Sequence, residues 1–244
     1  MLIIRLLRKF WLLFEKIEVD LSIHSKIIPQ GSAIVTDKKS SREESIAKLF
    51  DDMYSSKPEP PNFDNFDPSA KLQIKHILEN KAKSVLEVGM GAGGMLLVLQ
   101  ERGVEFVYGV ELSHEGTKLA QERFELFGDI DRAVFFEGSF LDYKPQKVDV
   151  VSFHQVLHCH PDIEGMVYKS LEASPKIIIN TMPRKTWYTT LLFNLISLFK
   201  FAAKGFKPYS HSPKKVETIL QEHNYSKIFT EKEFIWETSL FKLE

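Results

Sequence analysis

Apolar residues recur along the chain with two different periods. Short β-branched runs, of which Val85, Leu86 and Val88 form the first, have the composition of buried strands. Between these runs, apolar residues lie three or four positions apart, the spacing of helices that bury one face. Strands are predicted at 84–88, 106–111, 133–137, 147–153 and 175–180, and helices at 72–78, 93–101, 114–127, 161–172 and 213–222. This alternation predicts an α/β fold with a doubly wound, mostly parallel sheet.

The last part of the chain departs from this alternation. Two further strand-like runs cover 225–230 and 234–243, and only residues 231–233 separate them. So short a connection permits an antiparallel hairpin and no helical crossover. We therefore expect seven strands, mostly parallel, with an antiparallel terminal strand.

The first 44 residues differ from the rest and are predicted to form a separate N-terminal helical extension. Over 1–17, apolar residues follow helical spacing, while Arg5, Arg8 and Lys9 share the other side. Two interpretations stay open: a helix packed on the domain, or a basic amphipathic helix lying on the inner face of a membrane. The basic residues and the lack of a small-residue cleavage site argue against a secretory signal. Residues 29–45 are polar and predict a linker or lid hinge before a domain at 45–244.

Composition narrows the class of protein. The 244 residues carry a net charge of −1, which argues against a nucleic-acid partner. The single cysteine, Cys159, excludes an internal disulfide and favours a reducing, cytoplasmic compartment. No apolar stretch is long and free enough of charge to predict a membrane span.

The most informative stretch is Ser84 to Met95, which reads SVLEVGMGAGGM. The strand carries Glu87 near its end, and Gly89, Gly91 and Gly93 follow before the helix. Without a Cβ, such a turn lets backbone approach a nucleotide-like ligand, while N–H groups at the helix start point toward it. The next strand ends at Glu111, where a nucleotide-binding unit of this kind places its ribose-binding carboxylate. A tight turn without a ligand is the alternative.

The string EVGMGAG followed by GVELS strongly resembles the class I S-adenosylmethionine-dependent methyltransferases, over about residues 45–244. This resemblance implies a Rossmann-like sheet, S-adenosylmethionine as cofactor, S-adenosylhomocysteine as product and a small-molecule substrate. The glycine spacing also fits a nicotinamide-dependent oxidoreductase, but Glu87 and the terminal hairpin favour the methyltransferases. A non-catalytic cofactor-binding or scaffold protein of the same fold is the second alternative.

The resemblance also implies roles for individual residues. The three glycines would lie against the methionine and ribose of the cofactor, Glu87 would accept hydrogen bonds from its ammonium group, and Glu111 would accept both ribose hydroxyls. Ser139 stands where many members carry an acid that binds the adenine, and Phe140 would stack on that ring. The helix predicted at 45–54 resembles a family helix that closes the cofactor pocket. The other predicted cofactor contacts are Tyr54, Leu112 and His154.

Histidines follow the fourth strand in the segment HQVLHCHPD, residues 154–162. It resembles the family's loop beside the transferred methyl group, so His154 and His158 are the candidate catalytic residues. His154 would contact the substrate or remove a proton from it; the alternative is a histidine that only shapes the pocket. We predict no metal, because no further Cys/His cluster completes a ligand set. In-line methyl transfer needs orientation of the reacting atoms more than an acid or base.

Residues 182–209 are more apolar than one helix face requires and predict a hydrophobic insertion on the substrate side. The order of SPKIIINTMPRKT, a long apolar helix and then closing strands is similar, in layout and a few residues, to the magnesium-protoporphyrin O-methyltransferases. We expect a small, hydrophobic acceptor of aromatic, polyketide, porphyrin or lipid character. The predicted substrate contacts are Phe50, Gln155, Trp187 and Tyr188. A dimer interface or a core helix is the alternative for this segment, which leaves the oligomeric state open.

Overall fold

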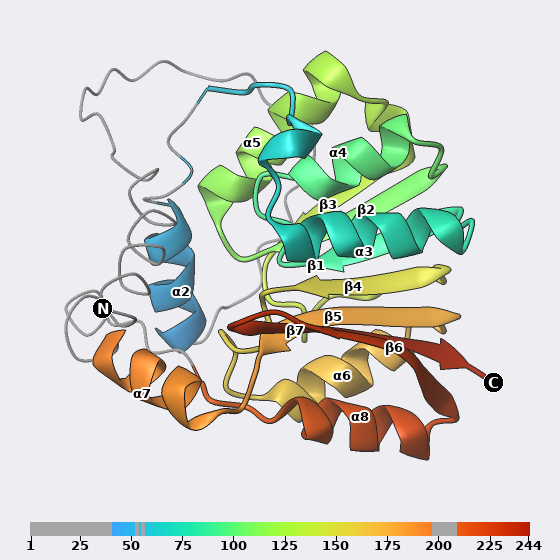
Figure 1. Cartoon of the computed structure of the whole chain (residues 1–244). Helices are drawn as coiled ribbons and strands as arrows, with labels where there is room; N and C mark the ends of the chain where they lie inside the picture. Colours follow the sequence, from blue (N-terminus) through green and yellow to red (C-terminus); the bar gives the residue numbers. More distant parts are fainter. Residues whose placement is uncertain (1–40, 52–53, 55–56, 197–208) are drawn as a thin grey trace. The chain divides into compact units, whose positions relative to one another are not determined.

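The computed structural model contains one seven-stranded sheet in the order β3-β2-β1-β4-β5-β7-β6 (Figure 1). The structure describes residues 41–51, 54, 57–196 and 209–244. The strands are β1 (Ser84–Val88), β2 (Phe106–Glu111), β3 (Ala133–Glu137), β4 (Val150–His154), β5 (Ile177–Pro183), β6 (Tyr225–Lys232) and β7 (Trp236–Leu243). The expectations for 1–40, including the amphipathic helix, and for 197–208 lie outside the described residues.

Strand pairing confirms the predicted topology. β1 pairs in parallel with β2 and β4, and these pair in parallel with β3 and β5. β7 runs antiparallel to both of its neighbours, β5 and β6. The strand that ends the chain therefore lies inside the sheet, between two strands that run the other way.

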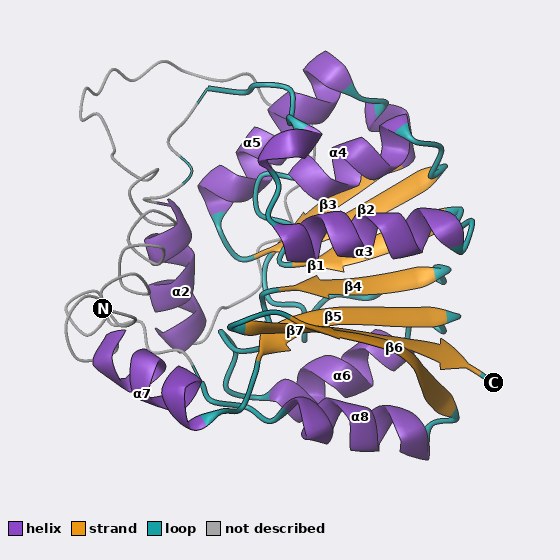
Figure 2. Ribbon diagram, in the orientation of Figure 1, coloured by secondary structure: helices purple, strands orange, loops and turns teal. Residues whose placement is uncertain are grey.

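Helices cover both faces of this sheet (Figure 2). One face carries α3 (Pro68–Glu79), α4 (Gly94–Glu101) and α5 (His114–Phe127), and the other carries α6 (Ile163–Leu171) and α8 (Pro213–Glu222). The remaining helical elements are α2 (Ser41–Asp51), α7 (Trp187–Ile196), and the 3-10 turns η1 (Phe63–Asn65) and η2 (Ile130–Arg132). Each face buries its own apolar cluster, as expected for a doubly wound fold.

The central strands are the most apolar because helices cover them on both sides. All seven residues of β5 are buried, whereas β3, at the sheet edge, is only partly buried. β4 and β5 begin two or three residues later than predicted. Asp149 explains part of this shift, because its carboxylate accepts hydrogen bonds from the backbone of Lys83 and Ser84 before β4 begins.

All of the described residues belong to one compact unit. The proposed boundary at residue 45 stays a prediction. Of the predicted insertion at 182–209, β5 takes up the first residues and α7 follows. Within the described part of the chain, no helix has both the length and the apolar character needed to cross a membrane.

Candidate active site

A cavity of about 400 Å³ lies at the carboxyl ends of the parallel strands. Its walls come from the turn after β1, from the ends of β2, β3 and β4, and from α2. The strand order reverses at β1, because β2 lies on one side of it and β4 on the other. Such a switch point is where open α/β sheets bind their ligands.

The turn after β1 depends on two glycines. Gly89 and Gly91 have φ values of +71° and +55°, in the left-handed region that side chains rarely adopt. A Cβ on Gly89 would lie 2.6 Å from Cγ2 of Val156, and one on Gly91 would lie 2.5 Å from the hydroxyl of Tyr54. The turn is therefore closed to side chains at both positions.

Glu111 joins the end of β2 to this turn. Its two carboxylate oxygens accept hydrogen bonds from the backbone N–H of Gly91 at 2.8 Å and of Ser113 at 2.9 Å. Burial raises the pKa of Glu111, although these N–H groups act in the opposite direction. A carboxylate has about four acceptor sites. The backbone N–H of Leu112 also hydrogen-bonds this carboxylate. Glu111 thus retains room for about one further donor, such as a hydroxyl.

Glu87 lies in the wall of the same cavity and is only 3% exposed. Among the described residues, its Oε2 atom is buried and has no hydrogen-bond partner. Burial, and then the negative charge of Glu111, raises the pKa of Glu87 well above its ordinary value. An unpaired buried carboxylate is costly, and a bound cation is the natural compensation.

Tyr54 covers the glycine turn. Its ring lies against Gly91 and against Gly116 at the start of α5, and Phe50 of α2 stacks on it at 6.3 Å between ring centres. Burial, followed by the charges of Glu111 and Glu87, raises the pKa of Tyr54, so the phenol stays protonated. Any molecule bound at the turn therefore shares this space with the Tyr54 ring.

Ser139 and Phe140 line the cavity beyond the end of β3. The Ser139 hydroxyl accepts a hydrogen bond from the N–H of Leu141 at 3.3 Å. Phe140 packs edge-on against Phe153 at 6.0 Å and is 3% exposed, so only a small part of its ring reaches the cavity. The structure therefore brings both residues to the cavity edge but orients Phe140 mainly into the core.

The cavity thus collects most of the residues predicted from the sequence. Those that line it are Phe50, Tyr54, Glu87, Gly89, Gly91, Glu111, Leu112, Ser139, Phe140, His154 and Gln155. Gly93 differs from the other two glycines, because it precedes α4 and faces Ala120 and Phe124. Helix packing accounts for a glycine at this position, and its contact with the cofactor stays a prediction.

Three other predicted residues also lie outside the cavity lining. His158 is buried with its ring 5.5 Å from that of Trp236, and burial, followed by the charge of His211, lowers its pKa to about 4. Trp187 is 79% exposed, and the Tyr188 hydroxyl donates to the backbone carbonyl of Phe234. Their roles in catalysis and substrate binding stay predictions.

His154 ends β4 and faces the cavity. Its Nε2 atom lies 3.0 Å from the hydroxyl of Ser69 and 3.5 Å from Oδ2 of Asp67, both near the start of α3. Gln155, the next residue, has φ +54°, which is uncommon for a residue other than glycine and costs conformational energy. Such strain directly after His154 is typical of a functional site.

Sequence reasoning missed these partners of His154. The D-P-S order before the helix at 72–78 indicates a capped helix start, but it does not say which strand end that cap approaches. A second pair was also missed: Glu43 of α2 lies 3.5 Å from Nε2 of His160, and both are buried. This pair joins α2 to the loop after β4.

Within the described residues, no three potential ligands are grouped closely enough to hold a metal ion.

Comparison with known proteins supports this picture at the level of the domain. A family model described as a methyltransferase domain matches residues 86–170. Over 83 residues, the chain is 30% identical to a predicted protein N5-glutamine methyltransferase of Methanocaldococcus jannaschii. The matched part is 34% of this chain and 41% of that protein, so the chain spans less than half the length of this curated relative.

Solved structures extend the likeness to the whole fold. Magnesium protoporphyrin IX methyltransferase from Synechocystis PCC 6803, with bound S-adenosylmethionine, matches with a TM-score of 0.60 and 15% identity over 86% of this chain and 100% of that one. Geranyl diphosphate C-methyltransferase from Streptomyces coelicolor, with bound S-adenosylhomocysteine, matches with a TM-score of 0.63 and 10% identity over 84% and 99%. This chain has the class I methyltransferase fold.

The resemblance predicted from the glycine turn and the terminal hairpin is thereby confirmed. The family-model match ends within α6, at residue 170. It covers the turn, Glu111, Ser139 and His154, but it excludes α2, α3 and β5 to β7. The parts of the cavity wall that come from α2 and α3 therefore lie outside the matched residues.

Proposed function

We propose that this chain transfers a methyl group from S-adenosylmethionine to a small, apolar acceptor by in-line displacement. The observation that carries the proposal is the buried, unpartnered carboxylate oxygen of Glu87 beside the glycine turn. S-Adenosylmethionine presents an ammonium group and a sulfonium, both cationic, and two ribose hydroxyls. Glu87 can pair with the positive charge, and the remaining acceptor site of Glu111 can take a ribose hydroxyl.

The same charges argue against a nicotinamide cofactor. A dinucleotide places its pyrophosphate at the turn between strand and helix. In this chain, the buried carboxyl groups of Glu87 and Glu111 line the cavity at that turn, and their ionised forms would repel phosphate. Arg123 also reaches this turn, where it donates to the Ala92 carbonyl at 2.9 Å. The two carboxyl groups beside the turn favour a cationic donor over an anionic one.

The remaining lining supports an apolar acceptor. The side of the cavity near α2 and α6 is lined by Ile46, Phe50, Cys159 and Met166. Burial, followed by the charge of Glu111, raises the pKa of the Cys159 thiol to about 12, so this side chain stays neutral. Two fold neighbours are named for a porphyrin and a prenyl diphosphate, both of which have large apolar parts. His154 and Gln155 are polar groups that could orient such a molecule.

When bound, the donor supplies a methyl group already activated by its positively charged sulfur. The contribution of this chain would then be to hold the donor against the glycine turn, to align the acceptor and to exclude water. Tyr54 and Phe50 lie over the turn and would provide that exclusion. An apolar wall beside His154 would align the acceptor.

Calorimetry tests the proposal directly. We expect S-adenosylmethionine and S-adenosylhomocysteine to bind at least about 100-fold more tightly than NAD, a difference of about 2.7 kcal/mol. Mass spectrometry of metabolite mixtures incubated with the donor should then detect products heavier by one CH₂ group. Equal affinity for NAD, or no binding of either sulfur compound, would refute the proposal.

A further inference from the structure

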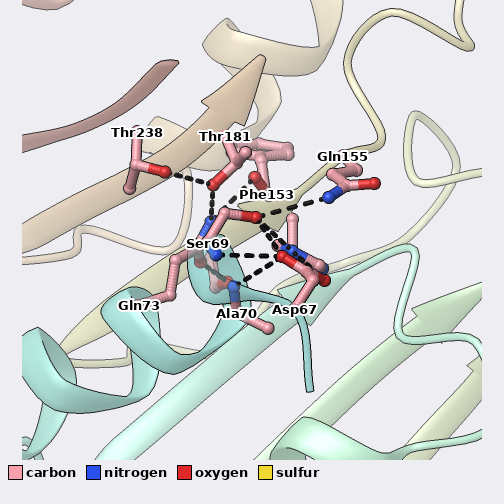
Figure 3. Close-up of polar contacts among 10 residues, drawn as sticks. Asp67, Ser69, Ala70, Gln73, Phe153, Gln155, Thr181 and Thr238 are labelled. Atoms are coloured by element: carbon pink, nitrogen blue, oxygen red, sulfur yellow. Dashed lines mark hydrogen bonds and ion pairs between the residues drawn. The ribbon is translucent and has the colours of Figure 1, made fainter. Parts of the chain in front are cut away.

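Asp67 makes more contacts than a helix cap requires. As the N-cap of α3, its Oδ1 accepts hydrogen bonds from the backbone N–H of Ser69 at 2.9 Å and of Ala70 at 3.1 Å (Figure 3). The same oxygen also accepts the hydroxyl of Ser69 at 2.5 Å, and Oδ2 lies 3.5 Å from Nε2 of His154. Capping alone accounts for the first two contacts and for neither of the last two.

The positions of the protons follow from these contacts. Burial raises the pKa of Asp67, but the interactions with His154 and Ser69 outweigh burial and hold the pKa well below its usual range. Asp67 is thus ionised and only accepts hydrogen bonds. Ser69 uses its one hydroxyl proton toward Asp67, so its oxygen can only accept, from His154 Nε2 at 3.0 Å and from the Gln155 amide at 3.3 Å. In the neutral ring of His154, Nε2 therefore carries the proton and Nδ1 carries the lone pair.

The hydrogen bonds from Asp67 through Ser69 to His154, called the relay below, are held in place by a buried polar network. Gln73, one turn further along α3, is fully buried and donates to the Thr181 hydroxyl at 2.8 Å (Figure 3). Its side-chain oxygen accepts the hydroxyl of Ser152 at 2.6 Å, and Thr181 bonds Thr238 at 2.9 Å. Three neighbouring strands are thus joined to α3 by buried hydrogen bonds. The start of α3 is held against the end of β4 before any ligand binds.

We propose that Asp67, acting through Ser69, positions His154 so that its Nδ1 removes the proton from a phenolic or enolic hydroxyl of the methyl acceptor. Asp67 and Ser69 are positioning residues, and His154 is the catalytic base. This inference rests on the function proposed above. It deepens that function by naming the acceptor class.

The step balances without a further reactant. The acceptor O–H bond breaks and its proton moves to Nδ1 of His154. The oxygen forms a bond to the methyl carbon, the bond between that carbon and sulfur breaks, and the electron pair stays on sulfur in the neutral thioether product. His154 becomes an imidazolium, and the Asp67 carboxylate stabilises its positive charge.

The strength of the base selects the acceptor. Imidazole titrates near about 6.5 in model compounds and phenols near about 10, a gap that concerted transfer can cover. A carboxylate acceptor has no proton to give up and needs no such relay. The apolar wall made by Ile46, Phe50 and Met166 fits the ring or conjugated system that carries an acidic hydroxyl.

Charged groups from other elements also face this relay. Glu233, in the turn between β6 and β7, interacts with both His154 and Asp67; burial, then the charges of Asp67 and Glu231, raises its pKa. Arg184, after β5, donates to the backbone carbonyl of Glu233 at 2.9 Å. Asp67 and Glu233 are thus the acidic side chains near His154, on two different elements.

Nitrogen NMR of histidine-labelled protein tests the relay without any substrate. The signals of His154 are assigned as those missing from His154→Gln. We expect the neutral ring to carry its proton on Nε2. In Asp67→Asn, which keeps the cap because asparagine caps equally well, the nitrogen signals of the ring should shift because Nε2 and Ser69 lose the carboxylate. Asp162→Asn is the matched control, because Asp162 caps α6. A proton on Nδ1, or equal shifts in both variants, would overturn the relay.

Turnover tests the acceptor class. Probes are 1-naphthol, 4-substituted phenols and 1,3-cyclohexanedione, with 1-naphthoic acid as the matched carboxylate. We expect methylation of the hydroxyl probes only, a loss of about 100-fold or more in kcat for His154→Gln, and about tenfold for Asp67→Asn at unchanged KM. Asp162→Asn should keep the parent rate. Preference for 1-naphthoic acid, or refusal of every hydroxyl probe, would overturn the acceptor class.

A calorimetric titration with S-adenosylhomocysteine distinguishes a failure of the proposed function from a failure of the relay. If the parent protein does not bind it, the proposed function fails. If the parent, His154→Gln and Asp67→Asn bind it equally but the NMR and turnover results contradict the role of His154, only the relay fails.

Discussion

The two sides of the cavity are built by different means. On the donor side, backbone N–H groups and two carboxyl groups come from a short stretch of chain, Glu87 to Ser113, and line the cavity at a glycine turn. On the other side, side chains separated by 85 positions, Ser69 and His154, meet through a helix packed on strand ends. The first arrangement is suited to binding one charged donor, and the second to moving a proton. Removing groups on the donor side should therefore change donor affinity, whereas changes near α3 should change turnover or stability.

The largest effect is expected from Glu111→Ala. It leaves the N–H groups of Gly91 and Ser113 without acceptors and removes the site for a ribose hydroxyl. Affinity for S-adenosylhomocysteine should fall about 100-fold or more, or about 3 kcal/mol, as measured by calorimetry. Glu105→Ala is the control, because Glu105 forms an exposed pair with Lys83. Retained affinity in Glu111→Ala would show that the turn does not hold the donor.

Gln73→Leu tests the support of the opposite side. The Ser152 hydroxyl and the Thr181 side chain each lose a buried partner, and we expect a loss of about 2 kcal/mol in the free energy of unfolding. Chemical denaturation measures this change, and Gln221→Leu on exposed α8 should leave it almost unchanged. Donor affinity should stay within about threefold of the parent for both variants. A large loss of donor affinity in Gln73→Leu would mean that the two sides are coupled.

Glu87→Gln should alter the pH dependence of stability and of donor binding. The folded-state pKa of Glu87 is raised from its ordinary value of 4.5, so its contribution to stability is fully present below that value. This contribution is lost as the pH rises through the raised folded pKa, where an unpaired charge must form inside the protein. Without donor, the parent should therefore lose stability toward alkaline pH more steeply than Glu87→Gln does.

A bound donor should lower the pKa of Glu87, because the positive charge of the donor favours the ionised carboxylate. Binding near neutral pH should release a proton, which calorimetry detects as a dependence of heat on the buffer. Glu87→Gln should abolish that release and weaken binding about tenfold. An identical buffer dependence in both proteins would contradict the predicted pairing.

The smallest effect is expected from Trp187→Ala. Because the side chain is 79% exposed, the free energy of unfolding should change by less than about 0.5 kcal/mol and donor affinity should not change. An increase in KM for the hydroxyl probes would support the predicted substrate contact. Leu126→Ala, at an exposed position of α5, controls for the loss of surface apolar area. Equal KM values in the two variants would exclude Trp187 from acceptor binding.

The sequence and the structure agree best where neighbours along the chain make the feature. The glycine turn, the acids near the ends of the first two strands and the hairpin of β6 and β7 each depend on residues close together in sequence. Their patterns therefore predict their geometry. Gly93 belongs to the same pattern but does not line the cavity, and a Cβ there would meet Ala120 and Phe124 of α5. Spacing alone does not distinguish a residue that lines a site from one that packs behind it.

What the sequence determined by itself is the class of fold and the donor side of the cavity, because a strand, a glycine turn and a helix have a local geometry set by backbone conformation. What only the tertiary structure decided is which distant side chains meet at the end of β4. The pairing of Asp67 and Ser69 with His154, and the position of Tyr54 over the turn, depend on how helices pack across strands. Packing direction is fixed by burial across the whole sheet, and no short stretch of residues carries that information.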